Sequence, residues 1–280
     1  MLRRRAFTCL GLAAWPLIGN SQQRRAQTDP MRLGVDFALF DSGLAAALLR
    51  GFGRDTGIAV RMVPGPAQAL LQALERGEID ALLNNTPALE AQFEKQGFVH
   101  ERAAVASSEF VLVGPLIKPA GKTKVKSKVK PLDPAGVTGS ANAVEALRRL
   151  RDAAAVDDSL VFLSANDGSG AHVAEQALWR AAKIAPAAPW YQSVEGASAL
   201  LRRARARSAY ALVERGVWAA AGGAPLAALV QDDPALLVPV NVMRGFRANH
   251  PGARFYAKWI SGPRGRAIVA AQRGYRVPAA

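Results

Sequence analysis

The stretch FLSANDGSGAH, residues 162–172, decides how the rest of the chain is interpreted. Apolar residues at 160–162 predict a short buried strand, and apolar residues at helical spacing predict a helix over 171–182. The small, polar and glycine residues between them predict a tight turn. The first N–H groups of a helix have no internal partners and the helix dipole adds positive charge there, so this turn is suited to holding an anion. The alternative is that Ser169 merely caps the helix.

Strands and helices alternate along most of the chain with short connections. This alternation predicts an α/β fold with mostly parallel strands and helices on both faces. Ligands of such sheets bind beyond the carboxyl ends of the strands, which here are residues 36–42, 64–68 and 84–87. We interpret residues 35–40 as a strand end followed by a loop, and Asp41 with Ser42 as the cap of the next helix. With 280 residues the chain exceeds the usual size of one core, so two lobes are expected.

The N-terminal segment 1–27 has the pattern of a secretory signal peptide: arginines at 3–5, an apolar run over 6–18 and then polar residues. The pair Arg4-Arg5 also fits the twin-arginine route, so both export routes remain open. Cys9, the one cysteine, lies in this leader, and the mature chain is therefore expected to have no disulfide or thiolate site. No later stretch of about 20 apolar residues is present, which predicts an exported, periplasmic protein.

Positive charge dominates the chain. The net charge is +14, and removing the five arginines of the leader leaves +9. Such a charge favours acidic membranes, nucleic acid or small anions without choosing among them. Nucleic acid is not expected, because the basic run 202–207 has no aromatic residues interleaved for stacking. The lysine-rich segment 118–132 is expected to be an exposed, mobile insertion, with a partner-docking surface as the alternative.

An ordered set of segments carries a family resemblance. They are 40–44 (FDSGL), 68–83 (QALLQALERGEIDALL), 86–87 (TP), 109–115 (EFVLVGP), 133–136 (DPAG), 162–172, 190–191 (WY), 209–212 (AYAL) and 215–216 (RG). Each is weakly specific, but together they cover nearly the whole mature chain in the right order. With them the chain resembles the periplasmic tungstate-binding proteins of ABC importers, which have the type II periplasmic-binding-protein fold.

The resemblance implies an α/β, two-lobed fold in which each lobe is a mixed, mainly parallel sheet flanked by helices. Lobe I is expected over 31–114 with 240–280, and lobe II over 115–239 with the insertion 118–132. A small oxyanion then lies in the cleft between the lobes, and an ABC permease in the inner membrane reads the closed form. We expect a monomer without cofactor, metal or nucleic acid.

The resemblance also places the ligand site. In that family, hydroxyl and N–H groups after the first strand grip the anion together with an arginine-containing turn of the second lobe. Here Asp36, Phe37 and Ala38 are expected to face this turn across the cleft. The expected residues of the turn are Ser164, Asn166, Ser169, Gly170 and Ala171. We expect N–H groups from Ser169 and Gly170, and polar contacts from Ser164 and Asn166.

This sequence departs from the family pattern at its contact positions. The run Val35–Ala38 has no hydroxyl, Ala165 stands where the arginine is expected, and Ala171 replaces a threonine. Each missing charged hydrogen bond costs about 1.5–3 kcal/mol, so tungstate binding is expected to be weaker by several factors of ten. An ionised Asp36 pointing inward would also repel an anion, whereas the alternative is an outward or helix-capping Asp36.

We therefore expect a periplasmic solute-binding protein of an ABC importer with tungstate or molybdate as ligand. The alternative is a diverged periplasmic ligand-binding or sensor module for a different small ligand. An enzyme is not expected. Gly168 directly precedes Ser169, which breaks the Gly-x-Ser-x-Gly spacing of serine hydrolases. The three histidines are too scattered for a zinc motif.

Overall fold

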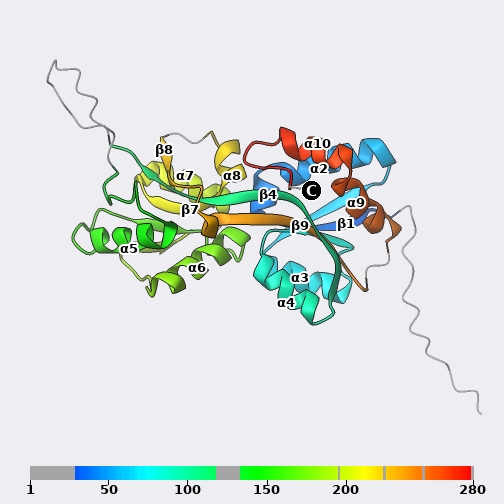
Figure 1. The fold of residues 1–280 in the computed structure, drawn as a ribbon, viewed down its shortest axis with the longest axis horizontal. Coiled ribbons are helices and arrows are strands. Elements are labelled where there is room, and N and C mark those ends of the chain that lie inside the picture. Colours follow the sequence, from blue (N-terminus) through cyan, green and yellow to red (C-terminus); the bar gives the residue numbers. More distant parts are fainter. Residues whose placement is uncertain (1–28, 118–132, 195, 223–224, 248–249, 279–280) are drawn as a thin grey trace, which may run out of the picture.

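A computed structural model of the chain describes residues 29–117, 133–194, 196–222, 225–247 and 250–278 (Figure 1). The expected signal peptide 1–27 with Cys9 and the lysine-rich insertion 118–132 lie outside the described residues. Within the described ranges, every helix is too short or too polar to cross a membrane.

The structure is a mixed α/β fold with two lobes lying side by side along the long axis of the molecule (Figure 1). The strands are β1 (Met31–Asp36), β2 (Val60–Gly65), β3 (Ala81–Asn84), β4 (Val99–Pro115), β5 (Phe162–Ser164), β6 (Tyr191–Ser193), β7 (Tyr210–Glu214), β8 (Leu226–Val230) and β9 (Leu237–Gly245). The helices are α1 (Phe37–Asp41), α2 (Leu44–Thr56), α3 (Ala67–Arg76), α4 (Pro87–Lys95), α5 (Ala143–Ala154), α6 (Gly170–Ala182), α7 (Ala197–Arg207), α8 (Arg215–Ala220), α9 (Pro251–Ser261) and α10 (Pro263–Ala271), with a 3₁₀ turn at Pro234–Leu236.

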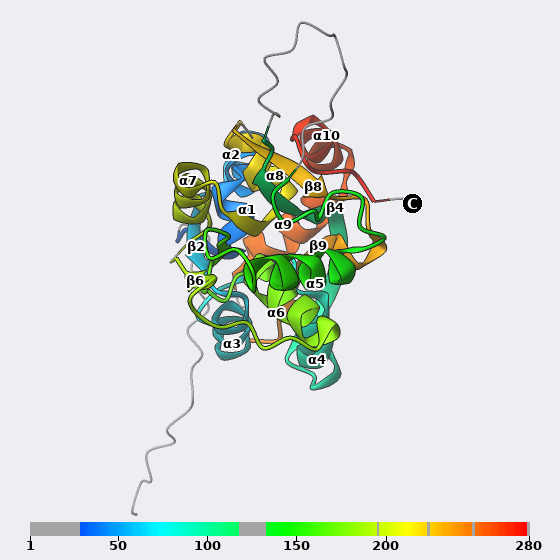
Figure 2. The same ribbon diagram turned by 90° about the vertical axis from the view of Figure 1, so that its left-hand side faces the viewer.

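The strands follow the order β2-β1-β3-β9-β4-β7-β5-β6, with β8 paired to β4. In the first lobe β1 runs parallel to both β2 and β3, and in the second lobe β5 runs parallel to both β6 and β7. Helices α3 to α6 cover one side of the strands, and α2, α8 and α10 cover the other (Figures 1 and 2). The α/β, two-lobed class expected from the sequence is confirmed.

Two strands cross from one lobe to the other. The first part of β4 pairs antiparallel with β9 from Val99 to Glu109, and its last part pairs with β7 and β8. The proposed lobe boundaries at 114/115 and 239/240 fall inside these two strands. The lobes therefore share a continuous sheet, and β4 and β9 are its two central strands.

Local sequence signals account for most helices. In α3 the inward positions Leu70, Leu71 and Leu74 are buried, and Gly77 ends the helix with a φ of 72°, a backbone conformation that favours glycine. Helix α5 begins where Asn142 accepts a hydrogen bond from the N–H of Glu145. The periodic pattern therefore predicts these helices without tertiary information.

The segment after β1 differs from the expectation. Residues 37–41 form the short helix α1 instead of a loop, because the Asp36 side chain accepts a hydrogen bond from Ala38 N and caps the first turn. Gly43, not the pair Asp41 and Ser42, is the cap residue of α2. A five-residue helix has too few positions to show a periodic pattern, and this is why α1 was expected as a loop.

A buried polar network joins the lobes on the side of the crossing strands. The Tyr275 hydroxyl lies 2.7 Å from Ser42 Oγ and 3.0 Å from Glu214 Oε2, and Ser108 Oγ hydrogen-bonds to Glu214 and to the Gly274 carbonyl. Burial raises the pKa of Glu214 to about 7, and hydrogen bonds to its carboxyl oppose this rise. Because its members come from both lobes and from the C-terminal segment, this network fixes how the lobes are joined.

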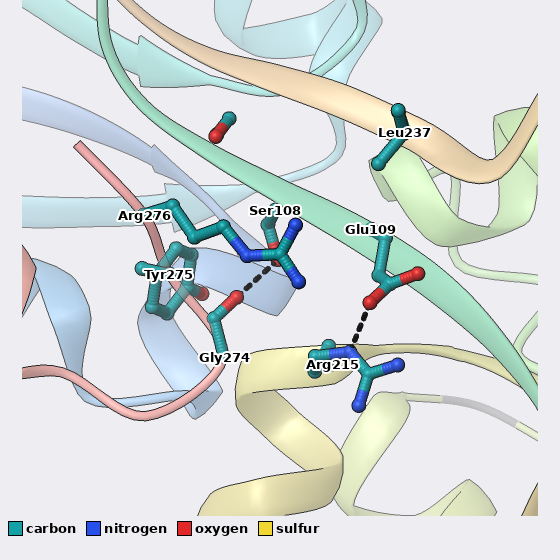
Figure 3. Close-up of a pocket in the computed structure, with 8 residues that line it drawn as sticks. Ser108, Glu109, Arg215, Leu237, Gly274, Tyr275 and Arg276 are labelled. Atoms are coloured by element: carbon teal, nitrogen blue, oxygen red, sulfur yellow. Dashed lines mark hydrogen bonds and ion pairs between the residues drawn. The ribbon is translucent and has the colours of Figure 1, made fainter. Parts of the chain in front are cut away.

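A cavity of about 170 Å³ opens beside this network (Figure 3). Arg215 at the start of α8 forms an ion pair across it with Glu109 of β4. Arg276 follows Tyr275 and pairs by backbone hydrogen bonds with Ser107 of β4. The C-terminal segment is therefore attached to β4 next to α8.

Replacing Tyr275 by phenylalanine should lower the free energy of unfolding by about 1–3 kcal/mol, because it removes a hydrogen bond from buried Glu214 and Ser42. Tyr256→Phe is the matched control. Its hydroxyl is fully buried and has no hydrogen-bond partner among the described residues, so its loss should be neutral or stabilising. Urea unfolding of the three proteins measures the difference, and equal effects of the two substitutions would contradict a role of the network in stability.

Candidate functional site

The N-terminus of α6 meets the carboxyl end of β1 between the lobes. Gly170 N, the first N–H of α6, donates a hydrogen bond of 2.9 Å to Asp36 Oδ2. Nearby, Ala67 N at the start of α3 donates to the Gly168 carbonyl at 3.0 Å. These bonds connect strand and helix ends of the first lobe with the turn 165–169 of the second, so the lobes are closed on each other here.

Asp36 is fully buried at this contact. Its Oδ1 accepts a hydrogen bond of 2.9 Å from Ala38 N, and its Oδ2 accepts the bond from Gly170. Burial raises the pKa of Asp36 to about 7, against the two N–H bonds, and the negative charges of Asp167 and Glu214 raise it further. An acidic side chain of the protein itself therefore lies at the N-terminus of α6, where helix geometry favours an anion.

The turn before α6 uses its own side chains to satisfy part of its backbone. Asp167 Oδ1 accepts from Ser169 N at 3.0 Å, and Ser169 Oγ caps α6 by accepting from His172 N at 3.4 Å. Ser164 is fully buried, and its Oγ accepts from Asn166 N at 3.3 Å. The N–H of Ser169 is thus bonded within the turn, whereas that of Gly170 reaches across to the first lobe.

The remaining candidate residues divide into two groups. Phe37 and Asn166 line a cavity of about 600 Å³ at one side of the contact. The other residues lining this cavity are Phe40, Asp41, Pro64, Pro66, Asp167, Gly196 and Ala197. Ala38 and Ala171 are buried in the apolar clusters of the second lobe. The structure therefore brings Asp36 and Gly170 into direct contact, places Phe37 and Asn166 along the cleft, and places Ala38, Ala171 and Ser164 beneath its surface.

Asn85 is a candidate residue that the sequence did not single out. Its side chain is 1% exposed, and neither Oδ1 nor Nδ2 has a partner among the described residues. It lies against Gly170, where a Cβ would overlap Asn85 Oδ1. Leaving a buried polar group unpaired costs about 1–3 kcal/mol, so a hydrogen-bond partner for this amide would stabilise the site. The sequence feature that could have identified Asn85 is its position in residues 84–87, at the carboxyl end of β3, where ligands of such sheets bind.

A second cavity, of about 370 Å³, adjoins Asn85 and Gly170 on the other side of the contact. Its walls are mostly apolar and come from α4, α6 and the region around β9. Asn85 and Thr86 supply polar side chains at its lining. The Asp36–Gly170 contact therefore lies between two cavities, one lined by its neighbours Phe37 and Asn166 and the other by Asn85 and Gly170.

Glu175 supports α6 from the side of the second lobe's core. It is 1% exposed, accepts a hydrogen bond of 2.7 Å from the Tyr191 hydroxyl and lies 3.2 Å from Trp179 Nε1. Burial raises the pKa of Glu175 to about 7, against these hydrogen bonds. Among the described residues, no group of three or more His, Cys, Asp or Glu side chains is arranged to hold a metal ion.

Comparisons with known proteins bear on the chain as a whole. The family model for the PBP superfamily domain matches residues 35–260. The tungstate-binding protein TupA of Peptoclostridium acidaminophilum is 30% identical over 236 residues, which cover 82% of this chain and 76% of that protein. A crystal structure described as the tungstate ABC transporter from Geobacter sulfurreducens is 28% identical, with a TM-score of 0.68 over 86% of this chain and 98% of that chain. TupA from Desulfovibrio alaskensis G20 is 25% identical, with a TM-score of 0.66 over 90% of this chain and 100% of that chain.

The substitution Glu175→Gln tests whether the pKa of the Glu175 carboxyl is raised in the folded protein, through the pH dependence of stability. A pKa raised from 4.5 to about 7 in the folded state means that the stability contributed by protonated Glu175 is present below about pH 4.5 and is lost as the pH rises through 7. The variant should therefore lose less stability between these pH values, by on the order of 2–3 kcal/mol. Urea unfolding across this range measures it, and parallel curves for variant and wild type would contradict the raised pKa.

Proposed function

Since the chain belongs to the PBP superfamily, we propose that it is the solute-binding protein of an ABC importer and holds a small oxyanion, tungstate or molybdate, between its lobes. The proposed place of action is the periplasm, after export by the general secretory or the twin-arginine route. The proposed partner is the permease of the importer, which would read the closed arrangement of the lobes. No covalent step is part of this function, and we propose a monomer that is not an enzyme and binds no nucleic acid.

The observation that carries the proposal is the Gly170 N–H, which already holds an anionic group across the cleft at 2.9 Å. An oxyanion in the position of the Asp36 carboxylate would accept from Gly170 N and from Ala38 N, the two donors that Asp36 now uses. Asn85 Nδ2 is buried beside Gly170 and has no partner among the described residues, so it is available as a further donor. Donors from both lobes would then meet on one ligand, and binding would favour closure.

One observation favours a second candidate function. Asp36 takes the donors that an oxyanion needs, and the expected arginine position is Ala165. A diverged binding or sensor module with a different small ligand is therefore the alternative. Phe37, Phe40 and Asp167 around the 600 Å³ cavity would then line the ligand site.

Isothermal titration calorimetry separates the two candidates. The protein is unfolded and refolded to remove bound anions, and tungstate, molybdate and sulfate are titrated into it separately. Binding of tungstate or molybdate in preference to sulfate supports the proposed function. An absence of heat with tungstate and molybdate up to high micromolar concentration would leave the second candidate.

Asn85→Ala should weaken tungstate binding by about 10- to 100-fold, because it removes one hydrogen bond to a charged ligand. The control is Asn142→Ala, which removes the cap of α5 on the surface and costs about 1 kcal/mol of stability. It should leave the affinity unchanged. Calorimetric titration of both variants compares them, and an unchanged affinity in Asn85→Ala would remove Asn85 from the site.

A further inference from the structure

We propose that Asp36 is an internal anion of the interlobe site, so that tungstate binds there only together with one proton. The inference rests on the proposed function and adds to it the residue that decides under which conditions an oxyanion enters. Asp36 would act as competitor of the ligand when ionised and as its hydrogen-bond donor when protonated.

The geometry of Asp36 is that of a bound anion. It is fully buried, and its two oxygens accept 2.9 Å hydrogen bonds from one N–H of each lobe, Ala38 N and Gly170 N. The second of these joins residues that are 134 positions apart in the chain. The unpartnered amide of Asn85 against Gly170 indicates independently that this place is built for more than the Asp36 carboxylate.

The ionisable groups around Asp36 do not neutralise it. Asp167 from the turn before α6 and Glu214 from the end of β7 both act on it as negative charges. Burial lowers the pKa of His172 of α6 against the charge of Asp167, and Tyr275 from the C-terminal segment has a pKa raised well above 10. Asp41 is the last residue of α1, the short helix that Asp36 caps. The charges that act most strongly on Asp36 are thus of the same sign as an incoming oxyanion.

Two ionised groups in hydrogen-bond contact inside a buried site repel each other strongly. A proton on Asp36 removes this repulsion and converts the carboxyl into a donor for an oxygen of the ligand. The pKa of Asp36, raised to about 7, places this proton within reach near neutral pH. Tungstate is fully ionised there, so the proton comes from the solution. Binding above pH 7 is therefore coupled to proton uptake.

Calorimetry of tungstate binding at pH 7, 8 and 9 tests this coupling. Titrations in two buffers with different ionisation enthalpies count the protons taken up. For the wild-type protein we expect an uptake of about half a proton per tungstate at pH 7 and of nearly one at pH 8 and 9, with an affinity that falls about tenfold from pH 8 to pH 9. A wild-type affinity that does not change from pH 7 to pH 9, without proton uptake, would overturn the inference while leaving the proposed function intact.

Asp36→Asn provides the decisive comparison. Asparagine caps a helix about as well as aspartate, so α1 keeps its first hydrogen bond in the ligand-free variant, which carries no ionisable group at this position. We expect no proton uptake, a flat pH profile, and at pH 9 an affinity about 100-fold above that of the wild type. Binding of tungstate by Asp36→Asn but not by the wild-type protein would support the inference most strongly.

Glu175→Gln is the matched control, because Glu175 is also a buried carboxyl with a pKa raised to about 7 but lies outside the contact between the lobes. This control should keep the proton uptake of the wild type. Loss of the uptake in Glu175→Gln, or its persistence in Asp36→Asn, would overturn the inference. If neither the wild type nor Asp36→Asn binds tungstate at any pH, both the inference and the proposed function fail.

Discussion

The hydrogen bond from Gly170 N to Asp36 is the contact on which the cleft depends. Through Asp36 it connects the end of β1 with the start of α6, and the same carboxylate fixes the first turn of α1. The close approach of Asn85 requires the absence of a side chain at position 170. A single acidic residue therefore determines the structure of α1, the spacing of the lobes and the charge at the centre of the site.

The two sides of the interlobe junction differ in strength. On the cleft side the lobes are joined by hydrogen bonds such as those of Gly170 and Ala67. On the opposite side they share β4 and β9, and Tyr275 ties both lobes to the C-terminal segment. A movement that separates the lobes would have to break the few hydrogen bonds of the cleft side, whereas the pairing of β4 with β9 holds the opposite side together. Such an arrangement suits a hinge on the side of the crossing strands.

The fold was predictable from the sequence where local patterns determine it. The helix over 67–76 and the order strand, turn, helix around 162–182 follow from apolar spacing and glycine positions, and both are present in the structure. Helix α1 was not predicted as a helix, because five residues are too few to show a periodic pattern, although a helix-capping Asp36 was one of the alternatives and Asp36 does cap it.

The candidate site shows the same division between local and long-range information. The turn before α6 was predicted as an anion-binding element from its own residues, and position 36 was identified as departing from the family pattern. The orientation of Asp36 was left open between a side chain that points inward beside the ligand and an outward or helix-capping one, and the structure shows a cap that also reaches the other lobe. Asn85 was missed because its isolation results from packing against Gly170, which no local pattern reveals.

The strand order also has a consequence for biosynthesis. β9 lies between β3 and β4 in the sheet, although it follows both in the chain by more than 120 residues. During synthesis β3 and β4 are therefore made long before the strand that joins them, and the sheet of the first lobe stays open at β3 until β9 has left the ribosome. A chaperone that holds this open edge has that interval in which to act.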